Sequence, residues 1–323
     1  MPSPGADHRG DQVAPAGDDQ ADMIEAFVRC LGRGHAEVAA VTDLTRPWPT
    51  STRTLLVTLH DGERLVVQRG QATRAGRALI SRRIRLGHAL RTAAPALGVP
   101  EVLGGDPRDA RGPWLASRFV EGRPGQELLA GDEDARALGA AAGMVAAEVT
   151  RLSPAGLRLP ARWADPHLLA RTATGWLRAV EGRLGAAETA AARAVIARVP
   201  TVFAASPAAV QHGDLAPVNL VLRDGRVAGL LDLERVRLAP AAFDAAWFRY
   251  LVRFHHPDPW AAVGPAFLAA CGIPDTPAGV ALLDDLAALA LLELAAGAET
   301  RAAGTRAAER RQWADRLAGH LRA

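Results

Sequence analysis

VQHGDLAPVNLVLRDGRVAGLLDLE, residues 210–234, places several polar side chains at defined points of an otherwise apolar segment. His212 and Asp214 are separated by one residue, and Asn219 lies five residues beyond Asp214. Asp232 follows Asn219 after a further thirteen positions. Carboxylate and amide oxygens are the ligands that Mg²⁺ prefers, and a carboxylate beside a hydroxyl group can accept its proton. The spacing therefore favours one polar site over separate turn residues.

The dipeptide Asp224-Gly225 lies inside this segment and predicts a tight hairpin turn. The apolar runs on either side of it, residues 220–222 and 227–233, are predicted to be the two strands. Such a hairpin can place Asn219 and Asp232 on one side of a site. A simpler alternative stays open, because Gly and Asp favour turns and His-Gly-Asp is also a plausible turn sequence.

The composition of the 323 residues is that of a soluble globular protein, with 49% hydrophobic and 23% charged residues and a net charge of +3. Lysine is absent, so arginine alone raises the isoelectric point to about 9.6. The sequence lacks the interleaved basic and aromatic residues of nucleic-acid-binding proteins and the run of about eighteen apolar residues that predicts a membrane span. Cys30 and Cys271 favour neither a disulfide framework nor a zinc site, and we expect a cytoplasmic protein.

The character of the sequence changes along the chain and divides it into three parts. Residues 1–22 are rich in Pro, Gly and Asp and are predicted to be a disordered tail. Residues 23–118 contain alternating apolar runs that predict a β-rich lobe, whereas residues 119–323 are Ala-rich with helical spacing. Strands are predicted over residues 37–44, 51–59, 63–69, 99–103 and 113–120, and helices over residues 21–31, 80–91, 133–152, 163–198 and 259–317. The sequence thus predicts an α+β fold.

Three motifs together resemble a known family: QHGDLAPVNLVL at residues 211–222, GLLDLE at 229–234 and AAFDAAWF at 241–248. In these motifs the chain is similar to the aminoglycoside phosphotransferase/choline kinase-like superfamily of small-molecule kinases. The resemblance implies a two-lobed, protein-kinase-like fold with a small nucleotide-binding N-lobe and a larger, mainly helical C-lobe that binds the acceptor. It also implies phosphorylation of a hydroxyl group on a small molecule, such as an antibiotic, an amino alcohol or a biosynthetic intermediate. The cofactors that it implies are ATP or GTP together with Mg²⁺.

The same resemblance implies roles for individual residues. Asp214 takes the place of the catalytic base, and His212 that of a residue organising the catalytic loop. Asn219 and Asp232 take the places of the Mg²⁺ ligands. Asp244 resembles an aspartate that supports the catalytic loop structurally.

Further residues resemble the nucleotide-binding positions of the family. Arg69, at the end of a predicted strand, takes the place of a phosphate-binding Lys, and a guanidinium group can bind phosphate through two hydrogen bonds. Ser51 and Thr52 lie where a loop covers the phosphates. Ser117 and Phe119 lie in the segment that resembles the hinge, whose backbone would contact adenine.

The N-lobe departs from the family pattern at two points. The turn over residues 48–52 contains no glycine, although glycine allows the closest approach of backbone to phosphate. The helix that should supply a Glu partner for Arg69 offers Arg82 or Arg83 instead, and like charges repel.

Two alternative functions therefore stay open. The first is a kinase that phosphorylates Ser or Thr of a natural-product precursor peptide. The second is a catalytically inactive pseudokinase that binds a ligand or a partner. Asp284 and Asp285, in a helix rich in Ala and Leu, either line an acceptor pocket or form a solvated helix face.

Overall fold

The computed structural model of the protein describes residues 24, 37–45, 52–300 and 306–322. The tail predicted over residues 1–22, nearly all of the helix predicted over residues 21–31, and Ser51 lie outside the described residues. The chain divides into two compact units, Met1–Ile84 with Glu101–Phe119 and Arg85–Pro100 with Val120–Ala323. Residues 85–100 thus group with the second unit, although they fall within the range predicted for the N-lobe. The roles predicted for the two lobes stay predictions.

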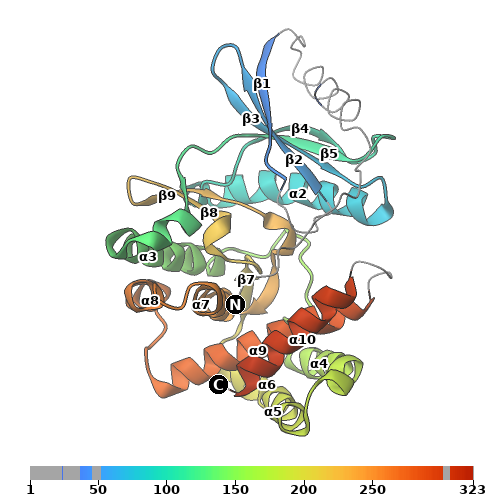
Figure 1. Cartoon of the computed structure of the whole chain (residues 1–323), viewed down its shortest axis with the longest axis vertical. Coiled ribbons are helices and arrows are strands. Elements are labelled where there is room, and N and C mark those ends of the chain that lie inside the picture. Colours follow the sequence, from blue (N-terminus) through green and yellow to red (C-terminus); the bar gives the residue numbers. More distant parts are fainter. Residues whose placement is uncertain (1–23, 25–36, 46–51, 301–305, 323) are drawn as a thin grey trace, which may run out of the picture. The chain divides into compact units, whose positions relative to one another are not determined.

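The first unit is built on an antiparallel sheet in the order β1-β2-β3-β5-β4. Its strands are β1 (Val38–Asp43), β2 (Thr52–Leu59), β3 (Arg64–Gly70), β4 (Val102–Asp106) and β5 (Trp114–Arg118). Alternate residues of the central strands, including Leu55, Val57, Leu65 and Val67, are fully buried, which is the period-two pattern of a sheet with one covered face. Helix α2 (Arg74–Ala93) starts in this unit, where Ile80 is buried, and continues into the second (Figure 1).

The second unit is mainly helical and also contains two small sheets, β6-β8-β9 and β10-β7. Its α-helices are α3 (Asp132–Thr150), α4 (Pro166–Val180), α5 (Ala186–Ala197), α6 (Val199–Ala205), α7 (Phe243–His255), α8 (Trp260–Cys271), α9 (Pro277–Thr300) and α10 (Arg306–Arg322). Its strands are β6 (Arg123–Pro124), β7 (Ala208–Gln211), β8 (Leu220–Arg223), β9 (Arg226–Leu230) and β10 (Arg237–Pro240). Short 3-10 helices are η2 (Pro95–Leu97), η3 (Gly125–Ala130), η4 (Glu181–Arg183), η5 (Pro217–Asn219) and η6 (Leu233–Arg235).

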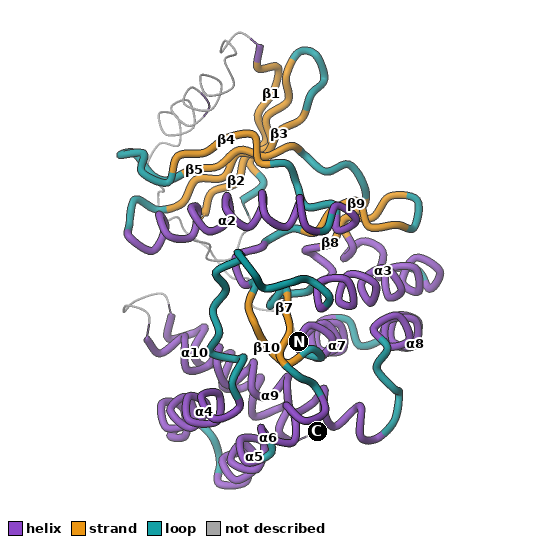
Figure 2. Tube along the Cα trace, turned by 180° about the vertical axis from the view of Figure 1, so that it is seen from behind, coloured by secondary structure: helices purple, strands orange, loops and turns teal. Residues whose placement is uncertain are grey.

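Helices α3 and α8 lie side by side in both views (Figure 1, Figure 2) and approach closely because glycines line the contact. A Cβ atom on Gly139 would lie 2.3 Å from the backbone oxygen of Val263. A Cβ atom on Gly143 would lie 2.5 Å from the backbone oxygen of Phe267. Small residues thus let two Ala-rich helices pack at backbone distance and bury Phe267 completely.

The predicted α+β fold is confirmed, and so is the hairpin turn at Asp224-Gly225, which joins β8 to β9. The long segments predicted as helical in the C-lobe each contain more than one helix: residues 163–198 give α4, η4 and α5, and residues 259–317 give α8, α9 and the first part of α10. Neither α7 nor β10 was predicted from periodicity. Among the described residues, no helix is both long and apolar enough to cross a membrane.

Candidate active site

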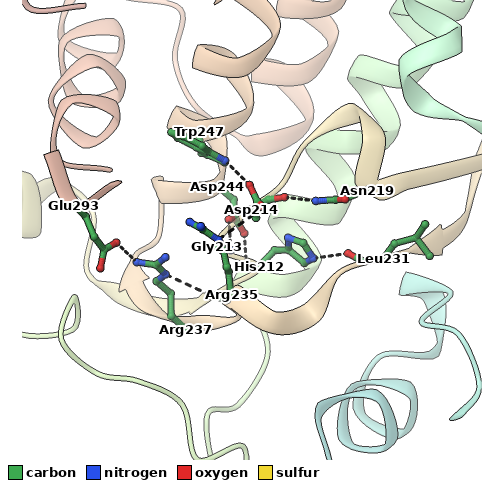
Figure 3. A network of polar contacts seen from close by, with 10 residues as sticks. All are labelled: His212, Gly213, Asp214, Asn219, Leu231, Arg235, Arg237, Asp244, Trp247 and Glu293. Atoms are coloured by element: carbon green, nitrogen blue, oxygen red, sulfur yellow. Dashed lines mark hydrogen bonds and ion pairs between the residues drawn. The ribbon is translucent and has the colours of Figure 1, made fainter. Parts of the chain in front are cut away.

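The His-Gly-Asp tripeptide follows strand β7 and passes through a tight turn (Figure 3). Gly213 has a φ of 81°, a left-handed conformation that is open to glycine and strained for other residues. A Cβ atom at this position would also lie 2.1 Å from the backbone oxygen of Arg235. Both the local conformation and the packing therefore require glycine between His212 and Asp214.

Asp244, near the start of α7, holds the His-Gly-Asp turn through hydrogen bonds to its carboxylate. Its two carboxylate oxygens accept the backbone N–H groups of His212, at 2.6 Å, and of Gly213, at 2.8 Å. The side chain of Gln211 accepts the backbone N–H of Asp244 in return, at 3.0 Å. Complete burial raises the pKa of Asp244, while the nearby His212 and the two backbone N–H groups act in the opposite direction. The predicted structural support by Asp244 is present.

The carboxylate of Asp214 is held by one hydrogen bond and is partly exposed. Its Oδ1 accepts the indole N–H of Trp247 at 2.8 Å, and its Oδ2 lies 3.9 Å from Nε of Arg235. The side chain is 29% exposed, whereas Trp247 is only 4% exposed. The bond between Trp247 and Asp214 joins residues 33 positions apart, beyond the reach of any local pattern.

Asn219 is buried and oriented by the loop itself. Its side-chain N–H donates to the backbone oxygen of Asp214 at 2.9 Å, and its backbone oxygen accepts from the N–H of Leu231 at 2.8 Å. A carbonyl oxygen can only accept, so the amide nitrogen must face it. The hydrogen bond thereby fixes which end of the amide faces the backbone of Asp214.

Asp232 follows the end of β9 with φ 60° and ψ 63°, a left-handed backbone at a residue other than glycine. This conformation costs roughly 1 kcal/mol, and such strain is concentrated at ligand-binding sites. The described residues contain no cluster of three or more His, Cys, Asp or Glu that could hold a metal ion alone. Two oxygen donors, Asn219 and Asp232, nevertheless fit Mg²⁺, because this ion usually keeps water and substrate phosphate as its other ligands.

His212 is buried, with 1% of its surface exposed. Its Nε2 donates to the backbone oxygen of Leu231 at 2.9 Å, and its Nδ1 has no hydrogen-bond partner among the residues that the structure describes. The ring therefore links the catalytic loop to the residue preceding Asp232. This position fits the organising role predicted for His212.

Arg237 holds the backbone of Arg235 and is itself held by Glu293. Arg237, on β10, donates to the backbone oxygen of Arg235 at 3.3 Å and forms an ion pair with Glu293 of α9 at 2.6 Å (Figure 3). The same carboxylate accepts the indole N–H of Trp163 at 3.2 Å. The two bonds to Glu293 carry no signal in the sequence, because their partners lie 56 and 130 positions away.

The predicted nucleotide-binding residues that the structure describes lie in the first unit, on β2, β3 and β5 and just after β5. Thr52 lies opposite Gly70, the residue after Arg69, and both Thr52 and Arg69 are buried. Ser117 lies opposite Val66 on the other side of β3. Phe119 packs under the guanidinium group of Arg64, 4.4 Å from the ring centroid.

Arg83, one of the two arginines expected at the position of the Glu partner, contacts a neutral side chain. Arg83 donates from Nη1 to the side-chain oxygen of Gln68, at 3.1 Å. Gln68 in turn donates to the hydroxyl of Thr54 at 3.4 Å. Helix α2 contains no Asp or Glu, so an ion pair of the kind found in kinases is absent from this helix.

Comparison with known proteins gives one family. The model of the phosphotransferase enzyme family matches residues 43–283. No curated protein matches the chain.

Solved structures match nearly the whole chain. The GDP complex of aminoglycoside 2'-phosphotransferase-IIIa is 15% identical, with a TM-score of 0.69 over 94% of this chain and 96% of that one. The macrolide 2'-phosphotransferase MphH from Brachybacterium faecium is 17% identical, with a TM-score of 0.63 over 92% and 98%. A thermostable mutant of aminoglycoside phosphotransferase APH(4)-Ia, in complex with ADP and hygromycin B, is 14% identical, with a TM-score of 0.64 over 93% and 98%. At these identities the likeness shows the fold alone, and it confirms the predicted kinase-like fold.

Proposed function

Because the chain belongs to the phosphotransferase enzyme family, we propose that it transfers the γ-phosphoryl group of ATP or GTP to a hydroxyl group of a small molecule. The observation that supports this most directly is the state of Asp214. One of its oxygens is bound by Trp247, and the other belongs to a partly exposed carboxylate beside Arg235. A carboxylate held in this way can accept and orient a hydroxyl proton.

In the proposed reaction, Asp214 receives the proton of the acceptor hydroxyl on Oδ2 as the acceptor oxygen attacks the γ-phosphorus. A new oxygen–phosphorus bond forms, the bond from the γ-phosphorus to the bridging oxygen breaks, and the nucleoside diphosphate leaves. Arg235 lies 3.9 Å from Oδ2, on the side of the carboxylate that would face the acceptor hydroxyl in this proposal. Positioning and electrostatics would account for the rate, without a covalent enzyme intermediate.

Asn219 and Asp232 would hold Mg²⁺ through their side-chain oxygens. When bound, the ion neutralises charge on the triphosphate. The buried amide of Asn219 is fixed by its bond to the backbone oxygen of Asp214, so the loop that holds the base also sets the metal ligand. His212 fixes the backbone that precedes Asp232.

For the nucleotide, we propose Arg69 and Thr52 of the first unit, with Ser51, as contacts of the phosphates. Ser117 and Phe119 would contact the base. The GDP and ADP complexes of the two aminoglycoside phosphotransferases support nucleotide binding by this fold.

The acceptor is proposed to be a small molecule of the size of an antibiotic, in line with the hygromycin B complex and the macrolide phosphotransferase. The pairing of two carboxylates of α9 bears on whether the acceptor is cationic or neutral. Asp284 pairs with Arg249 at 2.5 Å, and Asp285 pairs with Arg198 through two hydrogen bonds of 2.8 and 2.6 Å. A polycationic acceptor would compete with guanidinium groups for them, so neutral acceptors belong in any screen beside aminoglycosides.

The test is a phosphotransfer assay with labelled ATP or GTP, Mg²⁺ and a panel of macrolides, aminoglycosides, amino alcohols and Ser/Thr peptides. We expect transfer to at least one small-molecule hydroxyl and loss of that transfer in Asp214→Asn. The matched control is Asp224→Asn, in the exposed hairpin turn at φ 52°, a conformation that Asn accepts. Equal activity of wild type and Asp214→Asn would refute the proposal. Transfer to peptides alone would favour the precursor-peptide kinase.

Thermal unfolding with and without Mg-ATP tests the pseudokinase alternative. A protein that binds nucleotide is stabilised by mass action. No shift with either ATP or GTP, together with no turnover, would favour an inactive binding protein.

A further inference from the structure

One face of helix α7 contacts three consecutive residues of the catalytic loop. Asp244 and Trp247 are three positions apart and therefore lie on the same side of the helix. Asp244 accepts the backbone N–H groups of His212 and Gly213, and Trp247 donates to the side chain of Asp214 (Figure 3). The backbone and the reacting side chain of the loop are thus fixed by one rigid element.

The indole N–H is a donor with no acceptor capacity. Its 2.8 Å bond to Oδ1 of Asp214 is partly buried, since Trp247 is 4% exposed and the Asp214 side chain 29%. With Oδ1 occupied, rotation of the carboxylate would break this hydrogen bond, and Oδ2 is the oxygen that remains for a hydroxyl proton. We propose that Trp247 is a positioning residue for phosphoryl transfer, which fixes the orientation of the catalytic carboxylate; this inference rests on the proposed function.

A stack of rings holds the indole in place. Trp247 stacks on Tyr250, with ring centroids 5.5 Å apart and an interplanar angle of 24°, and Tyr250 stacks on Phe254 at 5.6 Å and 19°. His320 of α10 meets the ring of Tyr250 edge-on at 5.6 Å. The hydroxyl of Tyr250 has no hydrogen-bond partner among the described residues, so the tyrosine contributes its ring to this stack.

A packing role alone would predict something different from a positioning role. If Trp247 only filled space, its replacement by a smaller ring would lower stability and leave turnover per folded molecule unchanged. If it orients Asp214, loss of the N–H lowers kcat while the binding of both substrates is kept, because neither substrate needs that N–H for its affinity.

The kinetic test is Trp247→Phe, which keeps an aromatic ring on Tyr250 and removes the donor. We expect kcat to fall roughly tenfold to a hundredfold, as for other small misplacements of catalytic groups. The KM values for nucleotide and acceptor should stay within about twofold of wild type. The matched control is Trp176→Phe, also in the helical unit, which should keep wild-type kcat. If Trp247→Phe fails to fold, 3-benzothienylalanine at position 247 provides the same bicyclic shape without the N–H.

The second test needs no activity. In ¹⁵N NMR spectra of the free protein, the indole signal of Trp247 is identified by its loss in Trp247→Phe. We expect this signal to move in Asp214→Ala more than the signals of the remaining tryptophans, and to stay in place in Asp224→Ala. An unmoved signal in Asp214→Ala overturns the contact, and a wild-type kcat in Trp247→Phe overturns the positioning role. A wild type that phosphorylates no acceptor overturns the proposed function instead, while the NMR result still decides the contact.

Discussion

Gly213 and Arg235 approach so closely that a Cβ atom on the glycine would lie 2.1 Å from the arginine's backbone oxygen. The Nε of Arg237 would lie 3.1 Å from the same Cβ. Glycine is therefore required in this His-Gly-Asp motif by contact with the segment after Asp232, in addition to its positive φ of 81°.

Gly213→Ala should separate these two effects when it is compared with Gly225→Ala. Gly225 has a similar φ of 71°, but a Cβ there would have open space around it. We expect Gly225→Ala to lower the free energy of unfolding by roughly 1 kcal/mol with activity kept. Gly213→Ala should cost several times more and abolish phosphotransfer. Denaturant unfolding and the transfer assay check both variants, and equal losses would contradict the steric argument.

Asp244→Ala should be among the most destabilising substitutions in the helical unit. It leaves the buried N–H groups of His212 and Gly213 without their acceptor, and each such group costs about 1–3 kcal/mol. The expected loss of unfolding free energy is therefore roughly 2–6 kcal/mol, measured by denaturant titration. Asp275→Ala, at an exposed position before α9, should change it by less than about 0.5 kcal/mol.

Asp232→Asn tests the proposed metal site. A neutral amide binds Mg²⁺ less strongly than a carboxylate, so the Mg²⁺ concentration for half-maximal rate should rise roughly tenfold or more. Titration of the transfer rate with Mg²⁺ at saturating nucleotide measures this shift. Asp224→Asn removes the same charge from the nearby turn and should leave the titration unchanged. A shift of equal size in both variants would indicate a general effect of charge.

Tyr250 is the single tyrosine of the chain, so tyrosinate absorbance reports on one residue. Burial raises its pKa from 10.0 to about 12. An alkaline titration should give a midpoint near 12 for the folded protein and near 10 in concentrated guanidinium chloride. Between these values the unfolded chain has lost a proton that the folded chain keeps, so the unfolding free energy should fall as pH rises. Tyr250→Phe should abolish the signal, and a folded midpoint near 10 would show that the phenol is exposed.

Much of the site could be predicted because its parts are close in sequence. Asp214, Asn219 and Asp232 fall within nineteen residues, around a hairpin that Asp224-Gly225 specifies locally. The structure places the side chain of Asn219 against the backbone of Asp214, as the spacing predicts for one site.

The contacts that orient these residues could not be predicted in the same way. Trp247 reaches Asp214 from 33 positions away, and Glu293 reaches Arg237 from 56. Periodicity describes one element at a time, so it gives no information on contacts between distant elements. The burial of Arg69 likewise depends on neighbouring strands and could not be deduced from its own position.

The ion pairs of α9 have a consequence for handling the protein. Asp284, Asp285 and Glu293 each bind an arginine, and the hydrogen bond to Asp285 raises the pKa of Arg198 further. Lysine loses its charge near pH 10.4, whereas guanidinium groups keep theirs well above it. In a chain with no lysine, alkaline buffers near pH 10 should therefore leave these ion pairs of α9 intact. Labelling reagents directed at amines will also find no lysine side chain to modify, so dyes or surface attachment need another chemistry.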